Sequence, residues 1–205
     1  MHWIEKISKK ERIVIMMSFI RKLKGKIGKK QVIGFLILYI VMLVIMNYGK
    51  FAQVINATNV KILDTQFGYS VETAFQTIAA FGENGRNAYF NNLLLDCIFP
   101  ITYVLFLGSL FSFFINKYIR KDGPWDYVLL FPILSMIFDW CENVAIMVMI
   151  KTYPQELIGW ATFGRIATMI KTVFATMELI TLAVIVVSAI YFIITGIIKK
   201  FSSKK

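Results

Sequence analysis

Apolar residues gather in four long stretches of this chain, and polar residues gather between them. The four stretches span residues 32–48, 93–115, 127–150 and 172–198. A helix that crosses the hydrocarbon core of a bilayer needs roughly 20 apolar residues, and the last three stretches reach that length. The first stretch is shorter, and residues 51–55 can extend it. The pattern therefore predicts an all-α polytopic membrane protein with a bundle of four transmembrane helices.

Residues 1–30, ahead of the first span, are expected to form an additional helix. Apolar side chains recur there along one helical face, while lysine and arginine occupy the remainder. The apolar residues are Trp3, Ile4, Ile7, Ile13, Met17, Ile20 and Leu23. This spacing is typical of a basic amphipathic helix that lies on the inner leaflet, with a flexible basic tail as the alternative.

The long outer loop between the first two spans also contains a helix pattern. Ser70 is suited to cap this helix and Glu72 to occupy its first turn. Apolar residues then follow at helical spacing, namely Val71, Ala74, Phe75, Ile78 and Phe81. Gly82 offers a C-cap, and residues 82–86 read as a turn that leads into the second span. A further outer helix over 159–171 is expected to continue into the fourth span.

The composition agrees with a single membrane domain. Hydrophobic residues make up 58% of the chain and charged residues 17%, whereas soluble domains carry about 25% charged residues. We divide the chain into a basic segment (1–30), a transmembrane domain (31–198) and a basic tail (199–205). No internal repeat is visible in the sequence.

Lysine and arginine are distributed unequally between the two sides that the spans would separate. Seventeen lie in residues 1–30, in the loop between the second and third spans and in the tail, and six lie on the other side. The positive-inside rule then places both termini in the cytoplasm of a multi-pass cell-membrane protein. The net charge of +11 is therefore a topology signal. It favours anionic lipid headgroups, and not nucleic acid, as partners of the basic N-terminus.

Four carboxylic acids lie inside the predicted spans. An ionised side chain at the bilayer centre costs at least roughly 2.5–3.5 kcal/mol, so such residues indicate a functional site. The acids are Asp96, Asp139, Glu142 and Glu178. With a rise of about 1.5 Å per residue counted from the outer end of each span, all four fall in the outer half of the membrane.

Polar residues share one helical face on each of three spans. Asp139, Glu142 and Asn143, for example, are three and four residues apart, which brings their side chains together. Three such faces turned toward one another would enclose a polar pocket that opens to the outside. The predicted ligand-binding residues are Asp96, Tyr103, Asp139, Glu142, Asn143, Lys171 and Glu178, with Arg86 and Arg165 at the mouth of the pocket.

Three functions are compatible with such a pocket. The first is binding of an amphiphilic small molecule or membrane lipid. The second is an intramembrane enzyme acting on a lipid or sterol-like substrate, with Asp139 or Glu142 as catalytic general acid/base and Lys171 as a pairing group. The third is a structural or accessory subunit, whose acids are protonated or are paired only to stabilise the bundle.

No cofactor or metal is predicted. Zinc would normally use histidine or paired cysteines, although carboxylates and Asn143 would suit a hard cation such as Ca²⁺ or Mg²⁺. Cys97 and Cys141 form no C-x-x-C motif and are interpreted as small apolar residues. A transport path through four spans without an internal repeat would require a homo-oligomer.

A set of short motifs resembles those of a family of small four-span bacterial membrane proteins to which no activity is assigned. The motifs are Phe67-Gly68-Tyr69-Ser70, Gly85-Arg86, Tyr89, Asp96 with Pro100 and Tyr103, Asp139-x-x-Glu142-Asn143, and Tyr153-Pro154. The resemblance covers roughly residues 63–171, and it implies a four-span fold without implying an activity.

The chain also bears a weaker likeness to the superfamily of the sigma-2 receptor and sterol isomerases. Those proteins share a long outer loop, an acid early in the second helix followed by proline, and an intramembrane pocket for sterol-like ligands. The likeness implies that Asp96 and Glu142 are ligand-binding or proton-transfer acids. The chain departs from that pattern in two respects, because its first span contains no acid and its single histidine is His2.

Overall fold

The computed structural model describes residues 9–119 and 122–202, and it is all-α with no strand in these ranges. The helices are α1 (Lys9–Lys24), α2 (Lys29–Tyr48), α3 (Lys50–Ala57), η1 (Leu63–Thr65), α4 (Val71–Ala80), α5 (Gly82–Asp96), α6 (Phe99–Phe114), the π-helical turn η2 (Ile115–Ile119), η3 (Pro124–Leu129), α7 (Leu130–Thr152) and α8 (Ile158–Ser202). Residues 1–8 of the expected N-terminal helix and residues 203–205 of the basic tail lie outside the described residues.

Four helical segments in the described part of the chain are long and apolar enough to cross a membrane. They are Lys29–Ala57, Gly82–Ile119, Pro124–Thr152 and Ile158–Gly196. The prediction of a four-span bundle is therefore confirmed. Each segment is longer than its predicted apolar stretch, because further helical turns continue the stretch at one or both ends. The outer helix that begins near Gly159 does run into the fourth span, which gives the 45-residue helix α8.

The first span bends at Gly49. A Cβ atom at this position would lie 2.3 Å from the Ile45 carbonyl oxygen, so only glycine fits there. The Gly49 amide still bonds the same oxygen at 2.9 Å, and α3 then continues the span as the sequence predicts. Tyr39 attaches α2 to the bundle by stacking on Phe99 and Phe106 of α6, with ring centroids 5.7 Å and 5.4 Å apart.

The outer-loop helix α4 forms as predicted. The Ser70 side chain accepts the Thr73 amide at 3.0 Å and caps the helix. The expected turn over 82–86, however, is confined to Gly82, whose positive φ of 63° reverses the chain direction, and α5 begins at once. Gly85 has a packing role, because a Cβ there would lie only 3.1 Å from Phe81 Cβ and Thr58 Cγ2.

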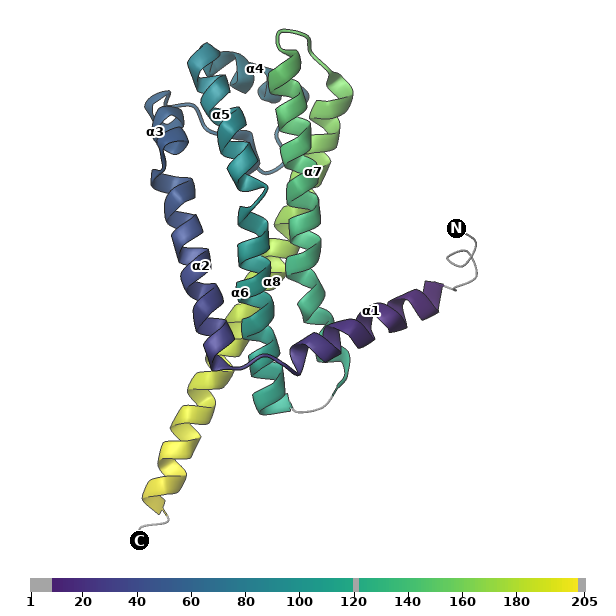
Figure 1. The fold of residues 1–205 in the computed structure, drawn as a ribbon, viewed down its shortest axis with the longest axis vertical. Coiled ribbons are helices and arrows are strands. Elements are labelled where there is room, and N and C mark those ends of the chain that lie inside the picture. The colour runs from purple at the N-terminus through teal and green to yellow at the C-terminus, as the bar shows by residue number, and fades with distance from the viewer. Residues whose placement is uncertain (1–8, 120–121, 203–205) are drawn as a thin grey trace.

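Helices α7 and α8 form a closely packed antiparallel pair (Figure 1). Gly164 on α8 makes the close approach possible, because a Cβ at this position would lie 3.1 Å from Ala145 Cβ and 2.6 Å from the Tyr69 hydroxyl. Small residues let helix backbones approach closely in membranes. The outer loop contributes Tyr69 to this contact.

The buried residues form two apolar clusters with a polar layer between them. We call the end of the bundle that carries α4 the outer end and the end beside α1 the inner end. The outer cluster joins α4, α5, α7 and the outer end of α8. It includes Leu63, Tyr69, Ile78, Tyr89, Leu93 and Ile146. The inner cluster consists of Phe111, Ile115, Leu129 and Ile185, with Ile20 of α1 packed against it. The predicted acids and Asn143 lie on the turns between these two clusters, whereas Arg86 lies beside the outer cluster.

Helix α1 lies across the inner end of the bundle (Figure 1) and is fixed there by ion pairs. The Lys24 ammonium group bonds Asp126 at 2.7 Å and Asp122 at 2.8 Å, and Arg21 Nε donates to Asp126 at 2.8 Å. Burial lowers the pKa of Lys24, but its hydrogen bonds to Asp122 and Asp126 outweigh burial, and the net shift is upward. The Asn116 amide also donates to the Lys24 carbonyl at 2.6 Å.

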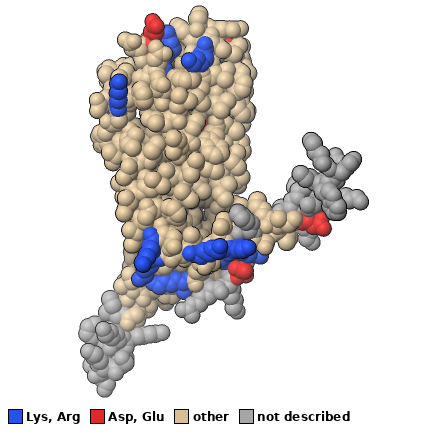
Figure 2. All heavy atoms as spheres, viewed as in Figure 1, with Lys and Arg blue, Asp and Glu red and all other residues tan. Residues whose placement is uncertain are grey.

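The apolar side chains of α1 are divided between two environments. Met17 is buried against the bundle, whereas Val14, Ile15 and Leu23 are exposed. Basic side chains gather at this end of the molecule, and the surface between the two ends carries almost none (Figure 2). An uncharged band of this kind is what the hydrocarbon core of a bilayer requires.

We predict that Lys24→Met loosens α1, because it removes the cation that joins Asp126 to the exposed Asp122. The loss should be about 1 kcal/mol, since Asp122 is exposed and Arg21 still pairs with Asp126. Hydrogen–deuterium exchange in residues 9–24 should then become about fivefold faster. Lys22→Met, which removes an exposed charge from the same helix, is the matched control, and equal exchange in both variants would contradict the role of Lys24.

Candidate functional site

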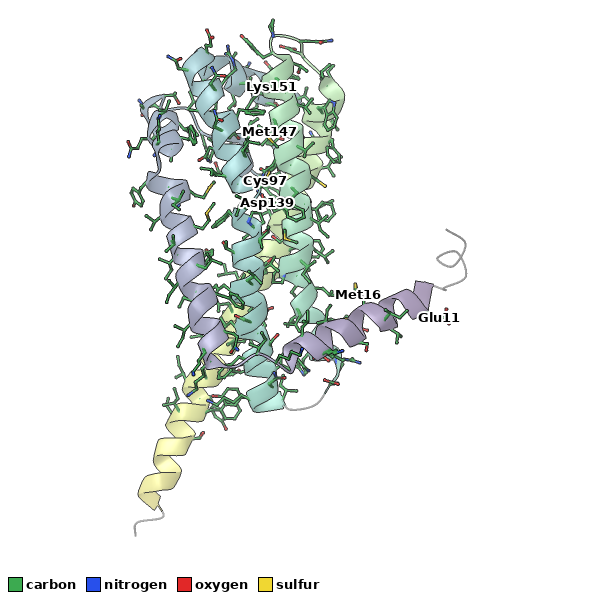
Figure 3. The ribbon with its side chains drawn as sticks, in the orientation of Figure 1. Glu11, Met16, Cys97, Asp139, Met147 and Lys151 are labelled. Carbon is green, nitrogen blue, oxygen red and sulfur yellow. The ribbon has the colours of Figure 1, made fainter. Side chains whose placement is uncertain are left out.

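The second span is interrupted at the level of Asp96. Helix α5 ends at Asp96 and α6 begins at Phe99, because Pro100 has no amide hydrogen to bond the Asp96 carbonyl and its ring crowds that group. Trp140 Nε1 of α7 donates to the Cys97 carbonyl at 2.9 Å. Figure 3 shows Cys97, at the break, level with Asp139 of α7. Non-helical backbone at membrane depth is tolerated where protein groups satisfy it in this way.

Lys171 of α8 lies between two acids of α7. Its ammonium group is 3.1 Å from Asp139 Oδ1 and also contacts Glu142 Oε2. Glu142 is completely buried, and its other oxygen accepts a hydrogen bond from the Thr168 hydroxyl. One cation therefore serves two carboxylates and ties α7 to α8.

Asp96 joins the same layer from the broken span. Its Oδ2 atom accepts the Asn143 side-chain amide at 2.8 Å. Asn143 is fully buried, and its Oδ1 atom has no hydrogen-bond partner among the described residues. We call the six residues Asp96, Asp139, Glu142, Asn143, Thr168 and Lys171 the acidic layer.

A second polar level lies farther inward. Tyr103 and Glu178 are each seven residues, or about 10 Å of helix, from Asp96 and Lys171 respectively. The Tyr103 hydroxyl and Glu178 Oε1 are buried and have no hydrogen-bond partner within the described chain. Glu178 also lines a cavity of about 260 Å³ between α2, α6 and α8, whose other walls include Tyr39, Phe106 and Leu182.

The two arginines expected at the mouth do not pair with the acids. Arg86 Nη1 donates to the Ile78 carbonyl at 3.5 Å, and its guanidinium lies 4.1 Å from the Tyr153 ring centroid. Arg165 of α8 has a buried Nε without a hydrogen-bond partner among the described residues. Lys171, by contrast, pairs with Asp139 and Glu142 and not with Glu178 of its own helix.

The outer loop closes over the layer with residues that sequence reasoning did not assign to the site. The Tyr89 hydroxyl donates to Asp64 Oδ1 at 2.9 Å and accepts the Leu63 amide at 3.0 Å, which fixes η1 over the bundle. The Tyr69 hydroxyl reaches Gly164 between α7 and α8. Burial, followed by the negative charge of Glu142, raises the pKa of Tyr69 well above its ordinary value.

Some of the missed residues had a recognisable signal. Thr168 lies three residues before Lys171, so the two share a helical face, and Trp140 is adjacent to Asp139 in sequence. Asp64 had no such signal, because it belongs to an irregular loop whose position over the bundle is set by tertiary contacts.

The fold and the site define an all-α, four-span membrane protein with a buried acidic layer. Comparisons with protein-family models, with curated proteins and with solved structures return no match. Within residues 9–119 and 122–202, no group of three or more histidine, cysteine, aspartate or glutamate side chains is placed to hold a metal ion. The function must therefore be argued from the geometry of the layer.

We predict that Lys171→Met destabilises the bundle by about 3–5 kcal/mol, because Asp139 and Glu142 lose their shared cation while they remain buried. Thermal unfolding in detergent should show a strongly lowered midpoint. Lys61→Met, which removes an exposed ammonium group from the outer loop, should leave the midpoint almost unchanged. Similar midpoints for both variants would show that the ion pair contributes little.

Proposed function

We propose that this integral membrane protein binds an amphiphilic small molecule or lipid next to its acidic layer, in the cavity lined by Glu178. The observation that carries the proposal is the environment of Glu178. The side chain is 7% exposed, its Oε1 has no hydrogen-bond partner among the described residues, and it faces an otherwise largely apolar cavity. A buried unsatisfied polar atom requires an explanation, and a ligand that donates a hydrogen bond supplies one.

The shape of the cavity supports an amphiphile. Tyr39, Phe106 and Leu107 offer an apolar and aromatic surface, with Glu178 as the acidic group. Ligand sites commonly combine mostly apolar walls with a few polar groups that orient the ligand. An apolar body would pack between α2, α6 and α8, while a hydroxyl or amine group reaches Glu178.

The charge balance supports the same proposal. Four acids lie in or next to the layer, and Lys171 contacts two of them. Asp96 accepts an amide hydrogen bond from Asn143 and forms no ion pair among the described residues. A layer that served the fold alone would need closer matching of acids and donors. The surplus of acceptors favours a ligand that brings donors or positive charge.

The proposed location is the cell membrane, with both termini in the cytoplasm. Helix α1 and the carboxyl end of α8 lie at the same end of the bundle, which is the end where basic side chains gather (Figures 1 and 2). The exposed lysines at this end include Lys22, Lys26, Lys29 and Lys30. They are suited to anionic headgroups of the inner leaflet, at about 1 kcal/mol each.

A structural role is the second candidate, and the contacts of Lys171 favour it. Asp139, Glu142 and Thr168 form a closed network with Lys171. Such a network can stabilise a helix pair without any ligand. It leaves Glu178 Oε1 and Asn143 Oδ1 without a hydrogen-bond partner among the described residues.

Native mass spectrometry of protein extracted from its own membrane in mild detergent tests the proposal. We expect wild type to retain one small molecule or lipid of defined mass. Glu178→Gln should lower its occupancy about 10- to 100-fold, because a charge-assisted hydrogen bond worth roughly 1.5–3 kcal/mol is lost. Glu83→Gln, at the exposed start of α5, is the charge-matched control and should retain the ligand.

Two results would contradict the proposal. One is a wild-type protein without a bound molecule together with lowered unfolding midpoints for Asp139→Asn and Glu142→Gln, which would assign the layer to the structural role. The other is equal occupancy in Glu178→Gln and Glu83→Gln. If wild type converts the bound molecule and Asp139→Asn does not, the protein is an enzyme and not only a binding protein.

A further inference from the structure

A larger cavity lies at the inner end of the bundle, separate from the acidic layer. It has a volume of about 410 Å³ and is formed by the end of α6, the turn η2, η3 and the inner half of α8. This volume falls in the range of ligand pockets, roughly 300–1,000 Å³. Ser188, in its α8 wall, is ten residues or about 15 Å of helix from Glu178.

The cavity depends on an irregular helix. The second span changes from α-helical to π-helical geometry over Ile115–Ile119, and such turns recur at functional sites. Tyr118 of this turn stacks on Phe192 of α8, with ring centroids 4.6 Å apart and planes 13° apart. This contact joins the two walls of the cavity at its inner end.

The walls are suited to a hydrocarbon chain. Phe111, Ile115, Val184 and Ile185 line the cavity, and no charged side chain does. Of the three hydroxyl-bearing residues in the walls, Tyr118, Thr181 and Ser188, Thr181 already donates to the Met177 carbonyl at 2.8 Å. An apolar cavity of this kind offers no partners to water, whereas a hydrocarbon chain would gain dispersion contacts along its length.

Aromatic residues lie at the end of the cavity, and a lysine lies beside one of them. Lys117 Nζ lies 4.9 Å from the Tyr118 ring centroid and 5.9 Å from that of Phe113. Trp125, which also lines the cavity, is 55% exposed. Tryptophan and tyrosine mark the headgroup level of a bilayer, and lysine there attracts anionic headgroups.

We infer that this cavity holds one chain of an anionic phospholipid, whose headgroup lies beside Lys117, Tyr118 and Trp125. The apolar walls select the chain, and Lys117 selects the charge of the headgroup. This site is independent of the ligand proposed for the acidic layer.

Lipid titration by native mass spectrometry tests the inference. The probes are dioleoyl phosphatidylglycerol and dioleoyl phosphatidylcholine, added to delipidated wild-type protein in detergent. Wild type should bind one phosphatidylglycerol with a Kd about fivefold lower than that for phosphatidylcholine, as one cation at the membrane surface would give. Lys117→Gln should abolish this preference for phosphatidylglycerol, but it should still bind both lipids through their hydrocarbon chains.

Ser188→Phe, which fills the cavity, should weaken the binding of both lipids at least tenfold. Its control is Val187→Phe, on the neighbouring face of α8, where the side chain is 66% exposed. Ser188→Leu, a smaller addition, replaces Ser188→Phe if the latter fails to fold, as judged by circular dichroism. Equal Kd values for the Ser188 variant and Val187→Phe would overturn the inference. Retention of detergent only, or equal wild-type affinity for the two lipids, would overturn it as well.

Discussion

The Lys171 ammonium group, enclosed between Asp139 and Glu142, sets the arrangement of the outer half of the bundle. A lone charge at this depth would be costly, and the pair is tolerated because Lys171 bonds both carboxylates and Thr168 donates to Glu142. The pairing joins α7 to α8 at one register, where Gly164 permits the close approach. The outer cluster packs on one side of this ion pair along the helices, and the inner cluster packs on the other side.

The second span is interrupted between Asp96 and Phe99, next to Pro100, and this break lets it pack against α7 at the same level. The break leaves Asp96 at the end of α5, where the Asn143 amide reaches it, and Trp140 takes the Cys97 carbonyl. Broken spans with exposed helix ends are used elsewhere in membrane proteins to build binding sites at this depth. Here the break brings a third acid next to the pair formed by Lys171, and the layer as a whole then has more acceptors than donors.

The sequence predicted the spans, the outer-loop helix and the shared face of Asp139, Glu142 and Asn143, because hydrophobic periodicity and i, i+3/i+4 spacing act locally. It did not predict which partner Lys171 would take. Glu178 shares its helix, but a seven-residue separation is about 10 Å, whereas Asp139 and Glu142 lie directly opposite on α7. The ion pairs of Lys24 with Asp122 and Asp126 were also missed, because they join residues about a hundred positions apart. Long-range pairs of this kind leave no periodic signal.

The free energy of unfolding of Glu178→Leu distinguishes a carboxylate that serves a ligand from one that the fold requires. Leucine has a similar volume and suits the apolar cavity, and Glu178 Oε1 has no partner to lose. Replacing a buried acid that the fold does not use should leave stability unchanged or raise it by about 1–2 kcal/mol. A loss of more than about 2 kcal/mol, measured by denaturation in detergent, would show that the fold depends on this carboxylate and would contradict the account.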